Sequence, residues 1–191
     1  MDKVKLGAAT FLYPLPVALV GARVDEAPNY LTVASLGVVQ HEPPILSVSL
    51  RRTHYTNRGI RRTGCFSINI PRADMVEVVD YCGIVSGRCA DKSALFTTFY
   101  GQLEEAPMAA ECPLNMECKL LQILDYGGDN ELFVGQVVQA YAEAKYLLDG
   151  VPDPTRMNPL AFTIHDNNYW RLGDHAGVAW EIGRCFKPPA D

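Results

Sequence analysis

The chain has 191 residues, a formal net charge of −5 and 48% hydrophobic residues, enough apolar sequence for the full core of one domain. The acidic balance argues against a nucleic-acid-binding protein, because such proteins bind by neutralising phosphates. No apolar run approaches the ~20 residues that span a bilayer, and the N-terminal MDKVKLG lacks the apolar core of a signal peptide. We therefore expect a single domain over residues 1–191, cytoplasmic, with no nucleic-acid or membrane partner.

The N-terminal part of the chain is predicted to form strands. Apolar and β-branched residues fill 16–24 and 29–39, and PPILSVSL at 43–50 alternates apolar and polar side chains with a period of two. DEAPN at 25–29 consists largely of turn-forming residues, so it predicts a turn between the first two strands.

The period then changes from strand to helix. A short helix is predicted after Thr53, which is a plausible N-cap, and Gly64 is expected to end it. CFSINI at 65–70 reads as the next strand. Residues 73–86 carry apolar side chains at helical spacing and predict a second helix. A charged loop is expected at 87–96.

The C-terminal part returns to strands. Residues 115–127 and 130–148 read as two long strands joined by the hairpin turn YGGDN, and 160–165 and 169–173 read as two short ones. Many strands, few helices and short connections favour an antiparallel β-barrel. No G-x-G-x-x-G motif follows a strand, so a Rossmann nucleotide site is not indicated.

One stretch is unusually basic for an acidic protein. SLRRTHYTNRGIRR at 49–62 holds five arginines, and no Asp or Glu occurs over 43–73. Arg51 and Arg52 supply planar donor groups where a helix begins, and Thr56 supplies a hydroxyl. This composition predicts a site for a phosphate of a small ligand, since the patch is short and the rest of the chain repels polyanions.

The alternative interpretation of this stretch is a solvated helix whose arginines pair with surface carboxylates. Arg58, Arg61 and Arg62 lie farther from the helix start, and we expect them to belong to that class.

Five blocks in order along the chain, over about 16–173, resemble the flavin reductase-like, FMN-binding split-barrel family and its flavoredoxin branch. Their shared order makes the resemblance specific. The blocks are NYLTVASLG, PPILSVSLRRTHYTNRGIRRTGCFSINIP, DYCGIVSGRCADKSALF, APMAAECPLNMECKL with ELFVGQV, and YWRLG.

The resemblance implies a mainly β, antiparallel split β-barrel with a few helices, forming a homodimer with FMN at or near the interface. It implies that one strand lines the flavin and its tail, with the matched residues Asn29, Thr32, Ala34 and Ser35. It implies that a strand end and the following helix start meet the phosphate, with the matched residues Ser49, Leu50, Arg51, His54, Thr56 and Ile60. It implies that a later loop and a late aromatic reach toward the flavin, with the matched residues Ser86, Gly87, Arg88, Asp91 and Lys92 in the loop and Tyr169 as the aromatic.

The function implied is an FMN-binding oxidoreductase of the flavin reductase type, which passes electrons from NADH or NADPH through flavin to an acceptor. The alternatives are a flavoredoxin-like carrier that exchanges electrons with a redox protein partner and has no nicotinamide site, and a barrel without turnover. No catalytic side chain is expected, because flavin N5 carries the hydride chemistry. No metal site is expected, because His165 and His175 have no partners at ligand spacing.

Two further expectations concern charge and thiols. Arg88 or Lys92 is expected to stabilise the reduced flavin, with a local Arg88–Asp91 ion pair as the alternative for that loop. The six cysteines are expected to be mostly small buried hydrophobes. The alternative is that Cys82 and Cys89 lie near the flavin and exchange electrons with a thiol partner.

Overall fold

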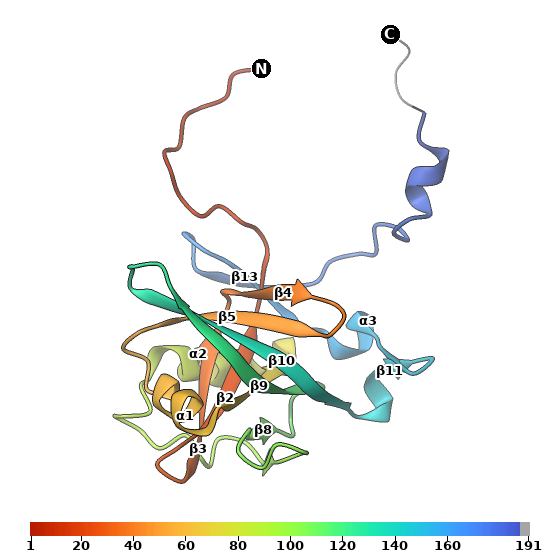
Figure 1. Cartoon of the computed structure of the whole chain (residues 1–191). Coiled ribbons are helices and arrows are strands. Elements are labelled where there is room, and N and C mark those ends of the chain that lie inside the picture. The colour runs from red at the N-terminus through yellow and green to blue at the C-terminus, as the bar shows by residue number, and fades with distance from the viewer. Residues whose placement is uncertain (188–191) are drawn as a thin grey trace.

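The computed structural model describes residues 1–187, so the end of the predicted 1–191 domain lies outside it. Its largest element is a seven-stranded antiparallel sheet (Figure 1). The strands, in spatial order, are β3 (Ala27–Val33), β2 (Ala18–Val24), β6 (Cys65–Ile70), β9 (Leu114–Asp125), β10 (Asn130–Ala142), β5 (Ile45–Arg51) and β4 (Leu36–Gln40).

The remaining elements are short. Three small antiparallel sheets comprise β1 (Leu15–Pro16) with β13 (Leu160–Thr163) and β14 (Asn168–Arg171), β7 (Thr98–Phe99) with β8 (Met108–Ala109), and β11 (Leu147–Leu148) with β12 (Val151–Pro152). The helices are α1 (Thr56–Thr63), α2 (Val76–Ile84) and α3 (Pro154–Met157), with 3₁₀ turns η1 (Ala73–Met75), η2 (Ala144–Tyr146) and η3 (Ile182–Cys185). None of the helices within residues 1–187 is long and apolar enough to cross a bilayer.

The sheet curls on itself because one stretch of chain supplies both of its edges. β3 pairs with β2, and β4 pairs with β5, yet only Ala34 and Ser35 separate β3 from β4. The single strand predicted at 29–39 is therefore two strands, since the chain changes partner at this point. The amide of Ser49 donates to the carbonyl of Ser35 at 2.8 Å and secures the bend. The predicted antiparallel split barrel is confirmed.

Alternating side chains of the strands fill two cores. Val20 and Phe133 point into the barrel and are fully buried there. Leu19 and Tyr30 point to the outer face and pack against Val79 of α2. The period of two in β2 and β3 thus places one apolar layer inside the barrel and a second beneath α2.

The turn between β2 and β3 is shorter than predicted. It consists of Asp25 and Glu26, whose φ angles are 47° and 67°, and the strand resumes at Ala27. A two-residue turn with positive φ at both positions matches the twist of the strands it joins. Pro28, expected within the turn, lies in β3, where its missing N–H is tolerated because β3 is an edge strand.

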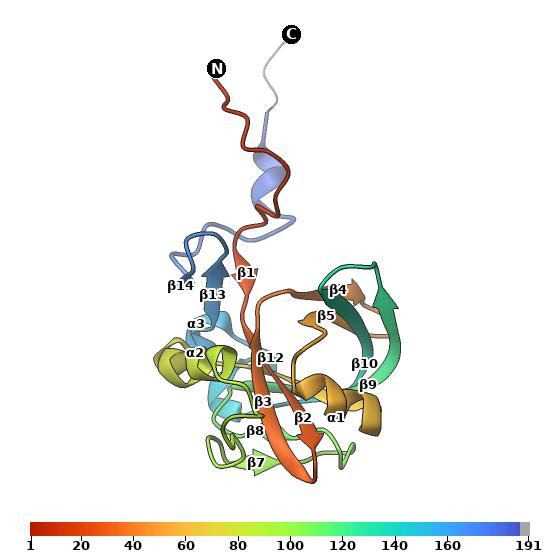
Figure 2. The same cartoon turned by 90° about the vertical axis from the view of Figure 1, so that its left-hand side faces the viewer.

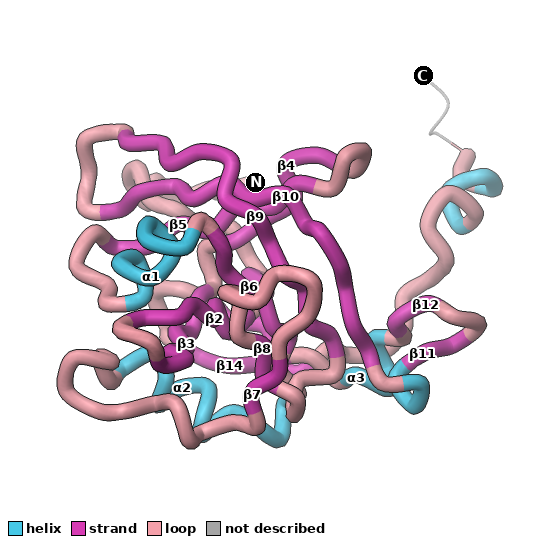
Figure 3. The backbone as a smooth tube through the Cα atoms, turned by 60° about the horizontal axis from the view of Figure 1, so that its bottom comes forward, coloured by secondary structure: helices cyan, strands magenta, loops and turns pink. Residues whose placement is uncertain are grey.

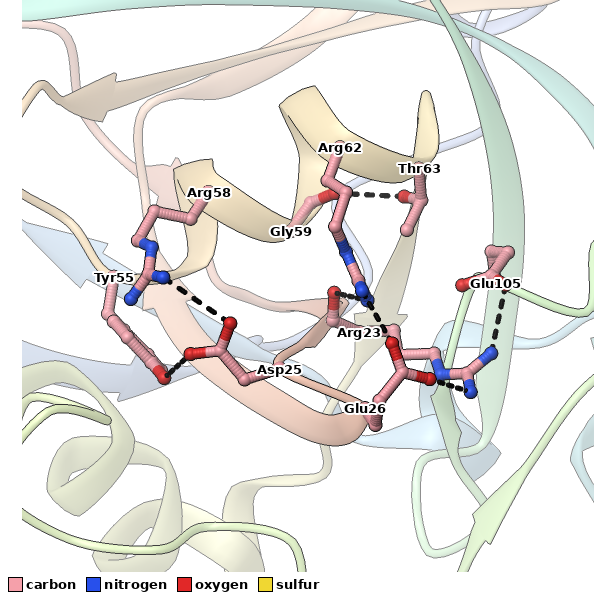
Figure 4. A network of polar contacts seen from close by, with 9 residues as sticks. All are labelled: Arg23, Asp25, Glu26, Tyr55, Arg58, Gly59, Arg62, Thr63 and Glu105. Carbon is pink, nitrogen blue, oxygen red and sulfur yellow. Dashed lines mark hydrogen bonds and ion pairs between the residues drawn. The ribbon is translucent and has the colours of Figure 1, made fainter.

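The two turn carboxylates tie the hairpin to α1 (Figure 4). Asp25 accepts hydrogen bonds from the Tyr55 hydroxyl at 2.8 Å and from Arg58 at 3.3 Å. Glu26 accepts from Arg62 at 2.5 Å. The expectation that Arg58 and Arg62 pair with surface carboxylates is confirmed, and the pairs hold α1 beside the hairpin.

Helix α1 begins later than predicted. Its N-cap is Tyr55, without a side-chain cap, so the assignment of Thr53 as N-cap is wrong. The preceding residues form a turn instead, in which the amide of His54 donates to the carbonyl of Arg51 at 3.0 Å. The amide of Arg52 donates to the carbonyl of Asp129 at 2.9 Å, next to the β5–β10 pairing. Gly64, at φ 68°, ends the helix as expected.

The β2–β3 hairpin lies between the two longer helices, with α1 on one side and α2 on the other (Figures 2 and 3). The start of α1 and the end of α2 are therefore both neighbours of β3. The chain ends leave the barrel together: residues 1–14 and 172–187 extend away from the same side of the molecule (Figure 1).

Candidate functional site

A hollow of about 230 Å³ lies where the start of α1, the end of α2 and β3 come together. We call it the polar hollow. It brings together several of the residues matched by sequence: Asn29, Arg51, His54, Thr56, Ser86, Gly87 and Lys92. Within the described part of the chain, no Asp or Glu is among its lining residues, which favours binding of an anion there. Arg51 also lines a neighbouring hollow that contains Asp129 and Glu131.

Arg51 is the arginine of the basic stretch whose guanidinium is not paired with a carboxylate in the described residues, so it can bind a ligand anion. Arg52 pairs with Asp125 and Glu131, and the other arginines of α1 also pair with carboxylates: Arg58 with Asp25, Arg61 with Glu131, and Arg62 with Glu26. Within residues 1–187 Arg51 has no ion-pair partner. The carboxylate-paired interpretation is therefore confirmed for Arg58, Arg61 and Arg62 and extends to Arg52. The anion-site interpretation stays a prediction, for Arg51.

Lys92 adds a buried cation to the polar hollow. Its side chain is 2% exposed, and its Nζ donates to the carbonyls of Tyr30 at 3.0 Å and Cys82 at 2.8 Å. Because an ammonium has three donors, one is left for a ligand. Burial lowers the pKa of this amine below its usual value.

His54 supplies an unpartnered polar atom in the same place. Its Nδ1 is buried and has no hydrogen-bond partner in the described residues. Burial lowers the pKa of His54, and the charges of Arg51 and Lys92 lower it further. A buried ring nitrogen without a partner is costly unless a ligand completes it. The residues of the polar hollow fit an anion with several acceptor oxygens, such as a phosphate.

A second hollow of about 350 Å³ lies next to the first, at the C-terminal turn of α2. We call it the apolar hollow. The two share Gly83 and Ile84 in their linings, so they adjoin at this turn, and together we call them the groove. Sequence reasoning missed both residues. The sequence signal was Ile84, a large apolar residue off the helix face of Val79 and Cys82, and the structure leaves it 74% exposed.

Three residues matched by sequence lie in the apolar hollow: Thr32, Ala34 and Tyr169. The Tyr169 ring packs against Phe162 with centroids 5.5 Å apart, and its hydroxyl donates to Asp80 at 3.1 Å. Burial and the Asp80 carboxylate raise the pKa of Tyr169 to about 12, so its hydroxyl stays protonated. This end of the groove suits a flat apolar ring system.

The other matched residues lie elsewhere in this chain. Leu50 and Ile60 are fully buried in the barrel core, so only their backbone can meet a ligand. Ser35 and Ser49 form the backbone pair at the β3–β4 bend. Arg88 and Asp91 line a third hollow, of about 300 Å³.

Of the two interpretations of the charged loop, the local ion pair is wrong. Arg88 and Asp91 form no ion pair with each other in the described residues; the Asp91 carboxylate accepts instead from the amide of Ser93 at 2.8 Å. Lys92, expected beside the flavin ring, lines the polar hollow and not the apolar one. In one copy of the chain, the cation therefore lies at the end of the groove that suits a phosphate.

The expectation of buried cysteines holds for three of the six. Cys82, Cys112 and Cys118 are buried, Cys65 is half-buried, and Cys89 and Cys185 are exposed. Burial raises the pKa of Cys82 to about 11, which keeps the thiol protonated and unreactive. The geometry of Cys82 therefore does not favour thiol exchange at this position.

Comparison with known proteins gives consistent results. Residues 10–156 match the sequence model of the family described as "Flavin reductase like domain". A flavoredoxin structure from Methanosarcina acetivorans is 44% identical, with a TM-score of 0.93, covering 96% of this chain and 98% of that one. A flavoredoxin from Desulfovibrio vulgaris (Miyazaki F) is 34% identical, with a TM-score of 0.89, covering 96% and 100%. An FMN-binding protein from Thermus thermophilus is 26% identical, with a TM-score of 0.79, covering 93% and 97%.

Proposed function

Because the chain belongs to the flavin reductase like domain family, we propose that it binds FMN in the joined hollows and acts as an oxidoreductase through that flavin. The observation that carries the proposal is the groove itself. One end has unpaired cations, a buried His54 Nδ1 without a partner and no carboxylate among its described lining residues, and the other end is apolar. FMN has the matching division into a dianionic phosphate and a tricyclic ring.

The chain's own residues have distinct tasks in this proposal. Arg51 and Lys92 hold the phosphate by charge-assisted hydrogen bonds, and His54 gains its missing partner there. Ala34 leaves room for the ring, and Tyr169 forms part of its wall. When bound, the flavin supplies hydride and electron transfer, so the protein's part is to bind, orient and shield it.

We also propose a homodimer with the flavin at or near the interface. The rim shared by the two hollows carries Ile84, and the nearby edge strand β4 carries Val38 and Val39, which are 61% and 55% exposed. Exposed apolar residues around a groove are typical of a surface that another protein covers. Analytical ultracentrifugation of the full chain tests this: a monomer at micromolar concentration would contradict it.

The electron donor has two candidates. The 44% identity to a flavoredoxin over nearly the whole chain favours a carrier that receives electrons from a reduced protein partner. The family's description as flavin reductase-like favours NADH or NADPH. We place the carrier first, because the similarity to the flavoredoxins is high over almost the full length of both chains.

One anaerobic experiment separates these functions. The purified protein is loaded with FMN, freed of excess flavin and mixed with NADH, NADPH or a reduced iron–sulfur protein while the flavin absorbance is followed. Bleaching by the iron–sulfur protein alone supports the carrier, and rapid bleaching by a nicotinamide supports the reductase. A protein that stays colourless after incubation with FMN would overturn both.

A further inference from the structure

Asp80 is a charged residue of the apolar hollow to which the proposed function gives no task. It lies on α2, is half-buried, and lines the hollow together with Ala34 and Tyr169. Within residues 1–187, no Lys, Arg or His is among the lining residues of this hollow, and Asp80 forms no ion pair. The end of the groove that suits a flat ring therefore carries a negative charge without a neighbouring cation.

Tyr169 holds this carboxylate at the wall of the hollow. Its hydroxyl donates to Oδ1 of Asp80 at 3.1 Å, and its ring packs against Phe162, which pairs with it across β13 and β14. The hydroxyl is neutral, so it orients the carboxylate without cancelling its charge. Asp80 and Tyr169 lie 89 positions apart along the chain, so no local pattern in the sequence predicts their contact.

A negative charge at this place acts differently on the two oxidation states of a flavin. The ring is neutral when oxidised, and reduction adds negative charge to it. Like charges repel more strongly beside an apolar lining than in water, because the local dielectric constant is lower. The site is thus expected to disfavour the reduced ring and to leave the oxidised ring unaffected.

We propose that Asp80 lowers the midpoint potential of the bound flavin by repelling the reduced ring, and that Tyr169 is the positioning residue that keeps the carboxylate there. The proposal rests on the proposed function, because it takes the flavin ring to lie in the apolar hollow. Its sign is opposite to that expected from Arg88 or Lys92 beside the ring, and neither of these lines the apolar hollow. With a lowered potential, the bound reduced flavin is a stronger electron donor than free reduced FMN.

The test measures the midpoint potential of the FMN-loaded, full-length protein by spectroelectrochemical titration. In wild type, reduced FMN is expected to bind about tenfold more weakly than oxidised FMN, which places the potential about 30 mV below that of free FMN for a two-electron couple. Asp80→Asn is expected to remove most of this difference, and to change the affinity for oxidised FMN less than about twofold by calorimetry. Glu77→Gln is the matched control, because it removes an exposed carboxylate of the same helix that does not line the hollow.

A double-mutant cycle tests the positioning role of Tyr169. Tyr169→Phe keeps the ring and frees the half-buried carboxylate to turn toward water, so the potential should rise, by less than in Asp80→Asn. In the Asp80→Asn background, the same substitution should change the potential no further, because its effect acts through Asp80. An equal shift in both backgrounds would show that the Tyr169 hydroxyl acts on the flavin directly, and would overturn this role.

Two results would overturn the role of Asp80 while leaving the proposed function intact. One is an equal midpoint potential in Asp80→Asn and Glu77→Gln, and the other is a wild-type potential at or above that of free FMN. If Asp80→Asn does not fold, as judged by circular dichroism, Asp80→Ser supplies the same loss of charge. Failure of wild type to bind FMN would instead refute the proposed function, so the two failures are distinguishable.

Discussion

Asn29 donates a hydrogen bond from Nδ2 to the hydroxyl of Thr56 across 2.8 Å, and both residues are buried. This contact joins β3 to the first residue of α1 at the floor of the polar hollow. Buried side-chain hydrogen bonds of this kind hold a site in one geometry, because breaking one leaves unsatisfied groups. The loop after α2 packs directly on the same amide.

Gly87→Ala is expected to displace that loop and impair flavin binding. A Cβ at this position would lie 2.1 Å from Oδ1 of Asn29, which real side chains do not tolerate. The loop or the amide must move, and we expect FMN affinity to fall at least tenfold, about 1.4 kcal/mol. Gly128→Ala is the matched control, since a Cβ there meets nothing within 4 Å. Equal FMN affinity in both variants would contradict the assignment of the polar hollow.

Two neighbouring arginines are expected to behave differently. Arg51→Ala removes a cation without a carboxylate partner in the described residues and should cost about 1.5–3 kcal/mol of FMN binding, tenfold or more. Arg52→Ala removes a guanidinium already paired with Asp125 and Glu131, and should change affinity less than about twofold. Titration calorimetry with FMN checks both. The reverse order of effects would remove Arg51 from the phosphate site.

The pKa of His54 is expected to change when the anion binds. In the free protein its pKa lies below 6.5, so the imidazole is neutral at pH 7, and a bound phosphate should raise that pKa. As the pH falls through 6.5, the unfolded chain takes up the proton first, so the free energy of unfolding of the flavin-free protein should decrease. His54→Gln should lose this part of the acid sensitivity.

Nuclear magnetic resonance titration of the histidine ring protons measures the effect, with His54→Gln assigning the signal. An apo pKa at or above 6.5, or no upward movement on adding FMN, would show that the imidazole does not face the phosphate.

Lys92→Met is expected to affect both stability and binding. The substitution leaves the buried carbonyls of Tyr30 and Cys82 without their donor, at a cost of about 1–3 kcal/mol for an unsatisfied buried group. For a chain of this size the melting temperature should fall by about 2–4 °C per kcal/mol. Lys119→Met, at an exposed position, should change neither the melting temperature nor FMN affinity. Unchanged FMN affinity in a folded Lys92→Met protein would limit Lys92 to a structural role.

Local patterns in the sequence predicted much of the fold. The apolar, β-branched run of β2, the period of two in β5, the helical stripe of α2 and the turn residues at 126–130 each depend on near neighbours only. The change of partner at Ala34 was not predictable in this way, because Ala34 and Ser35 carry no turn signal and the bend arises from pairing β3 with β2 and β4 with β5. The start of α1 was not predictable either, because a turn closed by the amide of His54 and the carbonyl of Arg51 follows β5 before the helix begins.

By itself, the sequence determined that the protein is a strand-rich barrel with an acid-free basic stretch suited to an anion. Composition and periodicity can be read from residues that are near neighbours along the chain. Only the tertiary structure decided which arginine of that stretch is left without a carboxylate partner in the described residues and can bind an anion. Arg52, Arg58, Arg61 and Arg62 meet carboxylates brought from distant strands and turns, whereas Arg51 faces a hollow with His54 and Lys92. Pairing of charges is a property of the folded arrangement, since the partners lie far apart along the chain.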